Sequence, residues 1–175
     1  KVIRVKTPPR PAGQSDVLKL RCEPISTVRV GFIGIGSRGL AAVHRFLSIP
    51  GVEIKALCDL ESENLDKARA LLVHAKFPAA QEYSSKNGYK EICERQDIDL
   101  IYICTDWLNH TPIAVYAMEH GKHTAIEVPA AVTLEQCWEL VNTAEKTRRH
   151  CMMLENCCYD RFEMATLNMA QKGLF

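Results

Sequence analysis

The sequence predicts an α/β fold with a doubly wound parallel sheet, and three observations lead to that prediction. From Val28 onward, short apolar runs alternate with helical patterns. A glycine-rich turn follows the first apolar run, and an acidic residue follows the second. The apolar content of 47% and the charged content of 25% are those of an ordinary globular chain. Strands that alternate with helices are typical of a parallel sheet covered on both faces.

The predicted elements can be placed along the chain in order. Strands are expected at 28–33, 52–58, 100–105, 123–127 and 151–155, and helices at 39–48, 63–75, 112–120, 134–147 and about 160–172. A turn at 87–89 precedes one further short helix. Residues 1–27, which include the prolines of "PPRP", are predicted to be an extended arm or linker.

Three of the helix ends carry their own signals. Thr133, with Gln136 three residues on, forms a capping box for the helix that follows. Gly121 suits the left-handed position just after a helix end. Thr111 is expected to cap the helix that Pro112 begins.

Composition and charge exclude several classes of function. The formal net charge is +1 and the basic residues are scattered, so nucleic acid is not expected as a partner. No apolar run reaches the roughly 18 residues that a transmembrane helix needs. Eight cysteines are present without a C-x-x-C pair; core packing is expected for those in apolar runs, and no metal site is predicted. Because the chain starts at Lys1 rather than at methionine, any targeting segment is expected to lie outside it.

The glycine-rich turn joins the first strand to the first helix. Its Gly34-x-Gly36-x-x-Gly39 spacing allows a tight turn, the approach of a pyrophosphate, and close contact between helix and strand. The helix N-terminus then faces the anion with free N–H groups. Glycine-rich turns also occur for purely steric reasons. The position between a predicted strand and a predicted helix favours the dinucleotide site of a Rossmann fold.

Asp59 stands 20 residues after Gly39, at the end of the second strand. A carboxylate there accepts hydrogen bonds from both hydroxyls of an adenosine ribose and repels a 2′-phosphate, which favours NAD over NADP. The alternative is that Asp59 caps the next helix. Arg38 leaves NADP as an alternative cofactor, because a guanidinium near the ribose can bind that phosphate.

The stretch "IYICTDWLNHTP", residues 101–112, begins in a predicted strand and ends in a predicted helix. At this point the order of strands in such a sheet should reverse and open a ligand crevice. Trp107 offers a flat face for a ring, and His110 can donate or accept a proton. In the alternative interpretation, Trp107 anchors a loop and His110 is a solvated loop residue.

Several longer strings resemble a known family. "GFIGIGSRG", "ALCDLE", "YICTDWLNHTPIAVYAMEHGKH" and "EVPAA" resemble the glucose-fructose oxidoreductase and inositol dehydrogenase family, whose members pair a Rossmann domain with an α/β substrate domain. More narrowly, "W..HTP", "EVPAA", "AEKTRRHCMMLENCCYD" and "FEMATLNMAQKGLF" are similar to glycoside hydrolase family 109, whose characterised activity is α-N-acetylgalactosaminidase. The similarity covers residues from Val28 to Phe175.

One position separates the two groups. The broad family usually has Glu-Lys-Pro after the fifth strand, with the lysine reaching the substrate hydroxyl. This chain has Glu127-Val128-Pro129, and a valine can neither donate a proton nor carry charge. The glycosidase branch has the same Glu-Val-Pro, so Val128 favours that branch.

The resemblance implies a division into domains and a set of cofactor contacts. Residues 28–156 are expected to form an NAD-binding Rossmann domain, and residues 157–175 the start of a substrate domain of which only the first helix is present. The resemblance adds eight contacts to the three glycines of the turn. The full set of expected NAD-binding residues is Gly34, Gly36, Ser37, Arg38, Gly39, Asp59, Trp107, His110, Glu127, Val128 and Asn156.

Two further expectations come with the resemblance. The branch commonly has proline where this chain has Asp106, and the carboxylate is interpreted either as a harmless loop residue or as a disturbance of the loop. The residues that meet the sugar are expected to lie beyond Phe175, which leaves His110 as the only local candidate for catalytic proton transfer.

The function implied is that of an NAD-dependent glycosidase acting on α-N-acetylgalactosaminides. In that mechanism C3 of the sugar is transiently oxidised, the acidified C2 proton leaves, the C1 group is expelled, water adds, and C3 is reduced again, so that NAD ends unchanged. An NAD-dependent sugar dehydrogenase and a non-catalytic dinucleotide-binding module are the alternatives. The expected partner is a small-molecule glycoside, and a homo-oligomer stays open. The resemblance suggests export, with a cytoplasmic location as the alternative.

Overall fold

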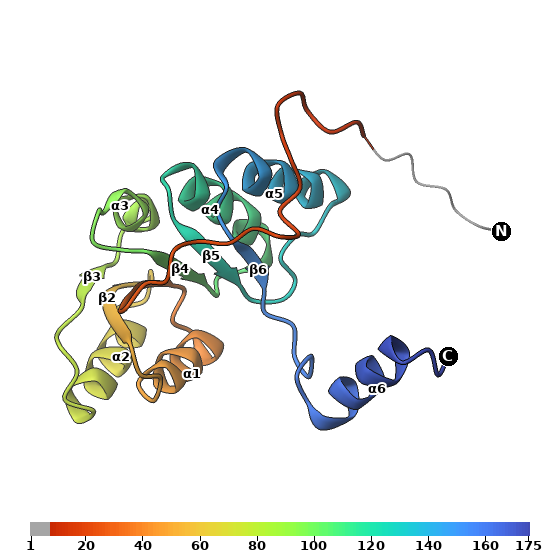
Figure 1. The fold of residues 1–175 in the computed structure, drawn as a ribbon. Coiled ribbons are helices and arrows are strands. Elements are labelled where there is room, and N and C mark those ends of the chain that lie inside the picture. Colours follow the sequence, from red (N-terminus) through yellow and green to blue (C-terminus); the bar gives the residue numbers. More distant parts are fainter. Residues whose placement is uncertain (1–7) are drawn as a thin grey trace.

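The computed structural model describes residues 8–175, and it confirms the doubly wound parallel sheet. Within this range, six parallel strands stand in the order β3-β2-β1-β4-β5-β6 (Figure 1). The strands are β1 Val28–Ile33, β2 Val52–Cys58, β3 Gln81–Tyr83, β4 Leu100–Ile103, β5 His123–Ile126 and β6 Cys151–Met153. The order therefore reverses between β1 and β4, where a crevice is expected in this class of sheet.

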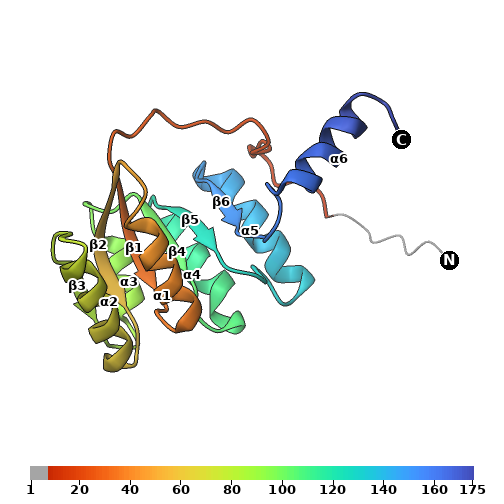
Figure 2. The ribbon, with the colours of Figure 1, turned by 90° about the horizontal axis from the view of Figure 1, so that it is seen from below.

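Helices cover both faces of the sheet. Helices α1 (Ser37–Phe46) and α2 (Ser62–His74) lie on one face, and α3 (Gly88–Glu94), α4 (Trp107–Glu119) and α5 (Leu134–Thr147) lie on the other (Figures 1 and 2). One core cluster, which includes Phe32, Val43 and Leu65, forms beneath α1 and α2. A second, which includes Ile92, Ile101, Ile113 and Met118, forms beneath α3 to α5.

The edge strand β3 is not among the ranges that the apolar runs predict. Its three residues, Gln81, Glu82 and Tyr83, are exposed or half-buried, because an edge strand has a neighbour on one side only. The predicted strands at 100–105, 123–127 and 151–155 end one or two residues earlier in the structure. The predicted strand residues that follow these observed ends are polar or half-buried, and they belong to the loops at the carboxyl edge of the sheet.

The predicted start of α4 is wrong. The helix begins at Trp107, and Asp106 is its N-cap, with Oδ1 accepting a hydrogen bond of 3.1 Å from the Leu108 backbone N–H. Thr111 lies inside the helix and donates to the Ala130 carbonyl at 2.9 Å. Pro112 also lies inside the helix. The aspartate supplies a cap five residues upstream, so the helix starts before the proline rather than at it.

The other two predicted helix ends are confirmed. Thr133 Oγ1 accepts from the Gln136 backbone N–H at 3.2 Å, and Gln136 Oε1 accepts from the Val132 backbone N–H at 2.9 Å. Gly121 has a φ of +80° directly after α4. The cysteines fit the expectation of core packing in part: Cys58 is buried, whereas Cys104 and Cys151 are half-buried, and all eight are free.

The arm that precedes β1 has no helix or strand over residues 8–27, as predicted, and it packs against α5. Arg10 forms an ion pair with the buried carboxylate of Glu145, with Nε 2.9 Å from Oε2. Arg148 donates to the Ser15 carbonyl at 2.8 Å. From α5 the arm continues to the start of β1 (Figure 2). Residues 1–7 of the predicted arm lie outside the described residues.

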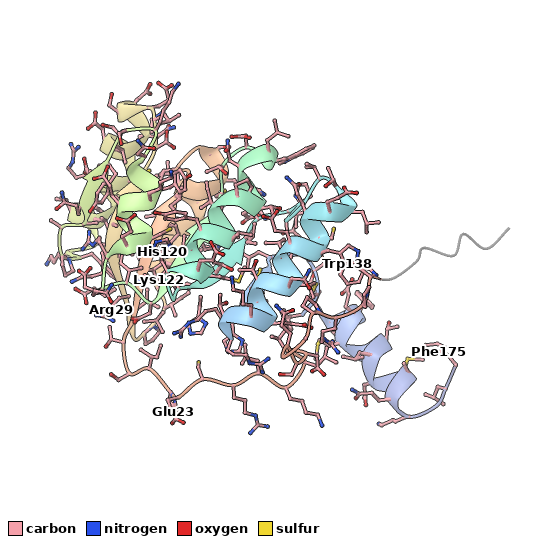
Figure 3. All side chains as sticks on the ribbon, turned by 90° about the horizontal axis from the view of Figure 1, so that it is seen from above. Glu23, Arg29, His120, Lys122, Trp138 and Phe175 are labelled. Carbon is pink, nitrogen blue, oxygen red and sulfur yellow. The ribbon has the colours of Figure 1, made fainter. Side chains whose placement is uncertain are left out.

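The edge of the sheet where the strands begin has charged groups of its own, and they serve the fold. Arg29 pairs with Asp99, with Nη2 2.6 Å from Oδ1. The buried Lys122, near Arg29 in Figure 3, donates to the Arg95 carbonyl. Burial lowers the pKa of Lys122, and this backbone acceptor partly replaces its lost water.

Helix α6 (Arg161–Gln171) differs from the other helices of residues 8–175. It stands apart from the sheet in Figures 1 and 2, and none of its residues is buried. Phe175 lies at the far end of this segment (Figure 3). Each helix of residues 8–175 is too short or too polar to span a lipid bilayer.

Candidate functional site

A cavity of about 550 Å³ opens at the carboxyl edge of the sheet. It is lined by residues that follow β1, β2 and β4, among them Gly34, Gly36, Asp59, Thr105 and Asp106. Because β1 and β4 flank the point where the strand order reverses, the cavity occupies the position at which open α/β sheets bind their ligands.

Two of the three turn glycines are explained by the protein itself. Gly34 has a φ of +86°, and a Cβ there would collide with the Cys104 carbonyl. A Cβ at Gly39 would collide with the Gly34 carbonyl. These two glycines allow the turn and the close contact between α1 and β1, so the steric interpretation of the turn is correct for them.

Gly36 is different. Its φ of −62° and ψ of −167° are open to any residue, and a Cβ there would meet no protein atom within 4 Å. It also lines the cavity. Neither backbone strain nor packing among the described residues requires a glycine at this position.

The start of α1 is suited to an anion. Gly36 is the N-cap and offers no side chain, and no acidic residue lies in the first turn. The first N–H groups of a helix have no partner within the helix, and the positive end of its dipole lies there. Ser37 and Arg38, two of the residues implied as cofactor contacts, are the first two residues of this turn.

Asp59 combines features of both interpretations of its role. Its Oδ2 accepts from the Ile35 backbone N–H at 2.6 Å, which ties the end of β2 to the glycine turn. Its Oδ1 accepts from the Glu61 backbone N–H at 2.9 Å and from Asn64 Nδ2 at 3.2 Å, near the start of α2. The N-cap residue of α2 is nevertheless Glu61, so Asp59 is not the cap itself. Each carboxylate oxygen has more than one lone-pair direction, so a carboxylate that lines the cavity keeps acceptor capacity for a ligand hydroxyl.

A second carboxylate, Glu127, follows β5 and is only 6% exposed. Its Oε1 accepts from the Tyr102 hydroxyl at 2.6 Å, and its Oε2 lies 3.0 Å from Arg38 Nε. Arg38 Nη2 in turn donates to Asn156 Oδ1 at 3.0 Å. Four residues, from α1, from β4 and from the segments after β5 and β6, thus form one hydrogen-bonded chain, which we call the Tyr102 chain.

The charges within the Tyr102 chain stabilise each other. The hydrogen bond and the charge of Glu127 raise the pKa of Arg38, against the opposing effect of burial. Burial and the hydrogen bond to Glu127 raise the pKa of Tyr102, so its hydroxyl remains a donor at neutral pH. A carboxylate removed from water in this way depends on its partners, because an unpaired buried charge is costly.

The Tyr102 chain also determines where Arg38 points. Its guanidinium lies with Glu127 and Asn156 in a second hollow of about 700 Å³, whereas Asp59 lines the first cavity. The sequence alone allowed Arg38 to lie near the ribose and accept a 2′-phosphate. In the structure, its hydrogen-bonding groups are directed to the β5 side.

His110 is not a solvated loop residue. It lies inside α4, is 1% exposed, and has Nδ1 2.8 Å from the Pro129 carbonyl and Nε2 3.1 Å from the Thr105 carbonyl. A neutral imidazole has one N–H, so it can donate to only one of these carbonyls. Its position between the loops that follow β4 and β5 is that of a structural link.

The remaining expected contacts lie near these loops. Trp107 begins α4 and is 62% exposed, so its ring face is accessible and it does not anchor a loop. Val128 is partly exposed beside Glu127. Asp106, where the branch commonly has proline, caps α4 and also accepts from Asn109 Nδ2 at 2.6 Å. Its carboxylate therefore stabilises the start of α4. Neither of the two interpretations from the sequence, a harmless loop residue or a disturbance of the loop, included this role.

The structure brings most of the implied residues to one edge of the sheet. Tyr102 is the residue that the sequence analysis did not find. A tyrosine within an apolar strand pattern usually packs its ring in the core, and nothing in the local sequence shows that its hydroxyl meets a carboxylate 25 positions later.

Comparison with known proteins places this geometry in a family. The model of the oxidoreductase family with an NAD-binding Rossmann fold matches residues 28–155. An α-N-acetylgalactosaminidase from Bacteroides fragilis is 59% identical over 171 residues, which cover 98% of this chain and 39% of that protein. A glycosyl hydrolase family 109 protein from Phocaeicola vulgatus is 59% identical over 174 residues, covering 99% of this chain and 37% of that protein.

Solved structures show the same fold at greater distance. The myo-inositol dehydrogenase of Lactobacillus casei, solved with NAD(H) and myo-inositol, has a TM-score of 0.72 at 23% identity and covers 84% of this chain and 42% of its own. The chain spans about two fifths of the length of the curated relatives it matches. It belongs to the glucose-fructose oxidoreductase and inositol dehydrogenase family of NAD-binding Rossmann proteins, and its near relatives are glycosyl hydrolase family 109 proteins.

Proposed function

We propose that the cavity at the carboxyl edge binds NAD. The first turn of α1, with Gly36, Ser37 and Arg38, would hold the pyrophosphate, because free N–H groups and the helix dipole favour an anion there. Asp59 would accept the hydroxyls of the adenosine ribose. Gly36 carries the proposal, since neither its backbone angles nor any protein neighbour within 4 Å requires a glycine.

The other half of the cofactor would be held by residues that follow β4, β5 and β6. Trp107 offers an exposed ring face, and Val128 and Glu127 stand at the end of β5. Asn156 joins them through Arg38. His110 would contribute by holding the loops at Thr105 and Pro129 together, and proton transfer by His110 is not part of the proposal.

The proposed preference is for NAD over NADP. The hydrogen-bond partners of Asp59 among the described residues are two backbone N–H groups and one amide, so its negative charge is not neutralised by a cation. Such a carboxylate accepts ribose hydroxyls and repels a 2′-phosphate. Arg38, the cation that the sequence left as an alternative partner for a 2′-phosphate, is engaged by Glu127.

The protein that carries this chain would be an NAD-dependent glycosidase for α-N-acetylgalactosaminides. The named relatives and the valine in Glu127-Val128-Pro129 support this choice over a sugar dehydrogenase. When bound, NAD supplies reversible oxidation at C3 of the sugar, which acidifies the proton on C2 and allows the group on C1 to leave. Residues 28–156 would bind and orient the cofactor, Val128 would bring no proton donor to it, and residues 157–175 would begin the substrate domain.

The test uses a protein that carries this chain together with the region that follows it in its relatives. An aryl α-N-acetylgalactosaminide should be cleaved without net formation of NADH, because the cofactor ends unchanged. The absorbance of NADH during the reaction measures this. In deuterated water, the released sugar should carry deuterium at C2, because that proton exchanges with solvent during elimination. Mass spectrometry and proton NMR of the product measure the label.

The other functions predict different results. A dehydrogenase would form NADH in proportion to substrate and leave the glycosidic bond intact. A direct displacement at C1 would cleave the bond but leave C2 unlabelled, which would contradict the mechanism and spare the substrate class. A non-catalytic module would bind NAD and give neither product.

A further inference from the structure

The ring of Tyr102 is fixed independently of its hydroxyl. It is 4% exposed and stacks on Phe32, with ring centroids 5.1 Å apart and planes at 29°. The edge of Phe46 meets it at 5.5 Å and 85°. Phe32 and Phe46 also contact each other at 5.1 Å. Because three aromatic side chains hold one another, a phenylalanine in place of Tyr102 would keep this packing and lose only the hydroxyl.

The hydroxyl meets a group that the proposed function uses. Its donor bond of 2.6 Å to Glu127 Oε1 leaves Oε2 for Arg38 at 3.0 Å. The Arg38 side chain is half exposed, and long exposed side chains lose much rotamer freedom when they are held in one place. Two contacts, to Glu127 and to Asn156, hold its head group at the start of α1.

We propose that Tyr102 is a positioning residue of the cofactor site: its hydroxyl fixes the Glu127 carboxylate, which in turn holds the guanidinium of Arg38 on the β5 side of the first turn of α1. The inference rests on the proposed binding of NAD and adds a residue that would not touch the cofactor. Tyr102 lies on β4, beneath the helix that carries Arg38, so its influence passes through Glu127. Charge-assisted hydrogen bonds of this kind are short and directional, and they restrict the orientation of the carboxylate.

The chain offers a matched control for the loss of a tyrosine hydroxyl. Tyr116, in α4, donates to Glu94 Oε1 at 2.5 Å, which is also a tyrosine-to-glutamate bond. Neither residue lines the cavity or the second hollow. Tyr116→Phe therefore removes the same kind of hydrogen bond at a distance from the site.

The experiment measures NAD binding by calorimetry in the purified wild-type protein, Tyr102→Phe and Tyr116→Phe. Tyr102→Phe should raise the Kd for NAD about tenfold, as expected for loss of a hydrogen bond to a charged group that orders a binding residue. Tyr116→Phe should leave the Kd unchanged within about twofold. The fluorescence of bound NADH should also shift in Tyr102→Phe, because the nicotinamide would meet a different arrangement of Glu127. A merely structural role would lower the melting temperature in both variants and move neither of these signals.

A second pair of variants tests whether the effect passes through Glu127. Glu127→Met removes the acceptor at similar volume, and Tyr102→Phe should have no further effect on the Kd in that background, within about twofold. If Tyr102→Phe alone does not fold because it leaves a buried carboxylate short of a partner, the double variant should fold, since both polar partners are then apolar. Comparison of the double variant with Glu127→Met then decides the question.

Each outcome has one meaning. An unchanged Kd in Tyr102→Phe, or an undiminished effect of Tyr102→Phe in the Glu127→Met background, would overturn the positioning role while NAD binding by the wild type stands. Absence of NAD binding by the wild-type protein would overturn the proposed function, and this inference with it.

Discussion

Two carboxylates at the carboxyl edge of the sheet, Asp59 after β2 and Glu127 after β5, have opposite surroundings. Asp59 accepts from backbone N–H groups and an amide, and it lines an open cavity. Glu127 is buried between a cationic side chain and a tyrosine hydroxyl. The first is therefore an acceptor that a ligand can still use, and the second is an anchor for Arg38. In the proposed function, the same residue chemistry at two strand ends would serve direct binding in one place and orientation of a neighbour in the other.

The glycine turn beside Asp59 gives the largest expected effect. Gly36→Val should abolish NAD binding and leave the fold intact, because the added side chain would stand in the open space next to α1 rather than against protein atoms. Calorimetry with NAD and far-UV circular dichroism measure the two parts of this prediction.

Gly39→Val serves as the contrast to Gly36→Val. A side chain there would collide with the Gly34 carbonyl, so this variant should lose its fold as well as its cofactor. If Gly36→Val kept both its circular dichroism spectrum and its affinity for NAD, the turn would serve packing alone. The proposal that the Asp59 side of the edge binds the ligand directly would then be contradicted.

Removal of Asp59 should have a smaller effect on binding. Asp59→Ala should weaken NAD binding by about 1 to 3 kcal/mol, since it removes charge-assisted hydrogen bonds to the ribose. It should weaken NADP binding less, because the repulsion of the 2′-phosphate disappears at the same time. Titration of both cofactors into the variant and the wild type gives the change in preference.

The matched control for Asp59→Ala is Asp66→Ala, which removes an exposed carboxylate from α2 whose one ion pair among the described residues is with Arg69, three positions on. Asp66→Ala should bind both cofactors as the wild type does. An equal loss in the two aspartate variants would mean that overall charge, and not a ribose contact, sets the affinity.

The smallest expected effect concerns Asp106, which lines the cavity and caps α4. Asp106→Ala should lower the free energy of unfolding by about 1 kcal/mol at neutral pH, the usual cost of a lost N-cap. Asp106→Asn keeps a capping acceptor and is the control for charge. Urea unfolding followed by circular dichroism measures both variants.

The charge of Asp106 gives this prediction a pH dependence. The hydrogen bond from Asn109, ahead of those from backbone N–H groups, lowers the pKa of Asp106 in the folded protein. The stabilisation by its charge is therefore fully present above the unfolded pKa of about 3.9 and is lost as pH falls through the lower folded value. The stability advantage of wild type over Asp106→Asn should disappear in that acid range, and an advantage that grew on acidification would contradict the assignment.

The sequence predicted well wherever the signal was local. The short apolar runs that alternate with helical patterns predicted the parallel sheet, because strands buried on both faces need continuous apolar residues. The capping box at Thr133 and the glycine after α4 depend on neighbours in the chain, and both were confirmed. The start of α4 was wrong because two capping signals competed, and Asp106 lies where a cap can begin a helix that Pro112 only interrupts.

The site was harder to predict, because its contacts join distant parts of the chain. The Tyr102 hydroxyl and the Glu127 carboxylate lie 25 positions apart, and Arg38 and Asn156 lie 118 positions apart. The burial of His110 between two carbonyls likewise depends on the loop after β5. The periodic pattern of apolar residues along the sequence does not indicate such long-range contacts. The resemblance to a family pointed to Arg38, Glu127 and Asn156 as cofactor contacts, but it could not tell how they meet or that Tyr102 joins them.

We propose that this edge of the sheet binds NAD and that Asp59 selects against a 2′-phosphate. Calorimetric titration of the unmodified protein with NAD and, separately, with NADP tests both parts. We expect saturable binding of one NAD per chain and weaker binding of NADP. Binding of NADP more tightly than NAD, or of neither, would contradict it.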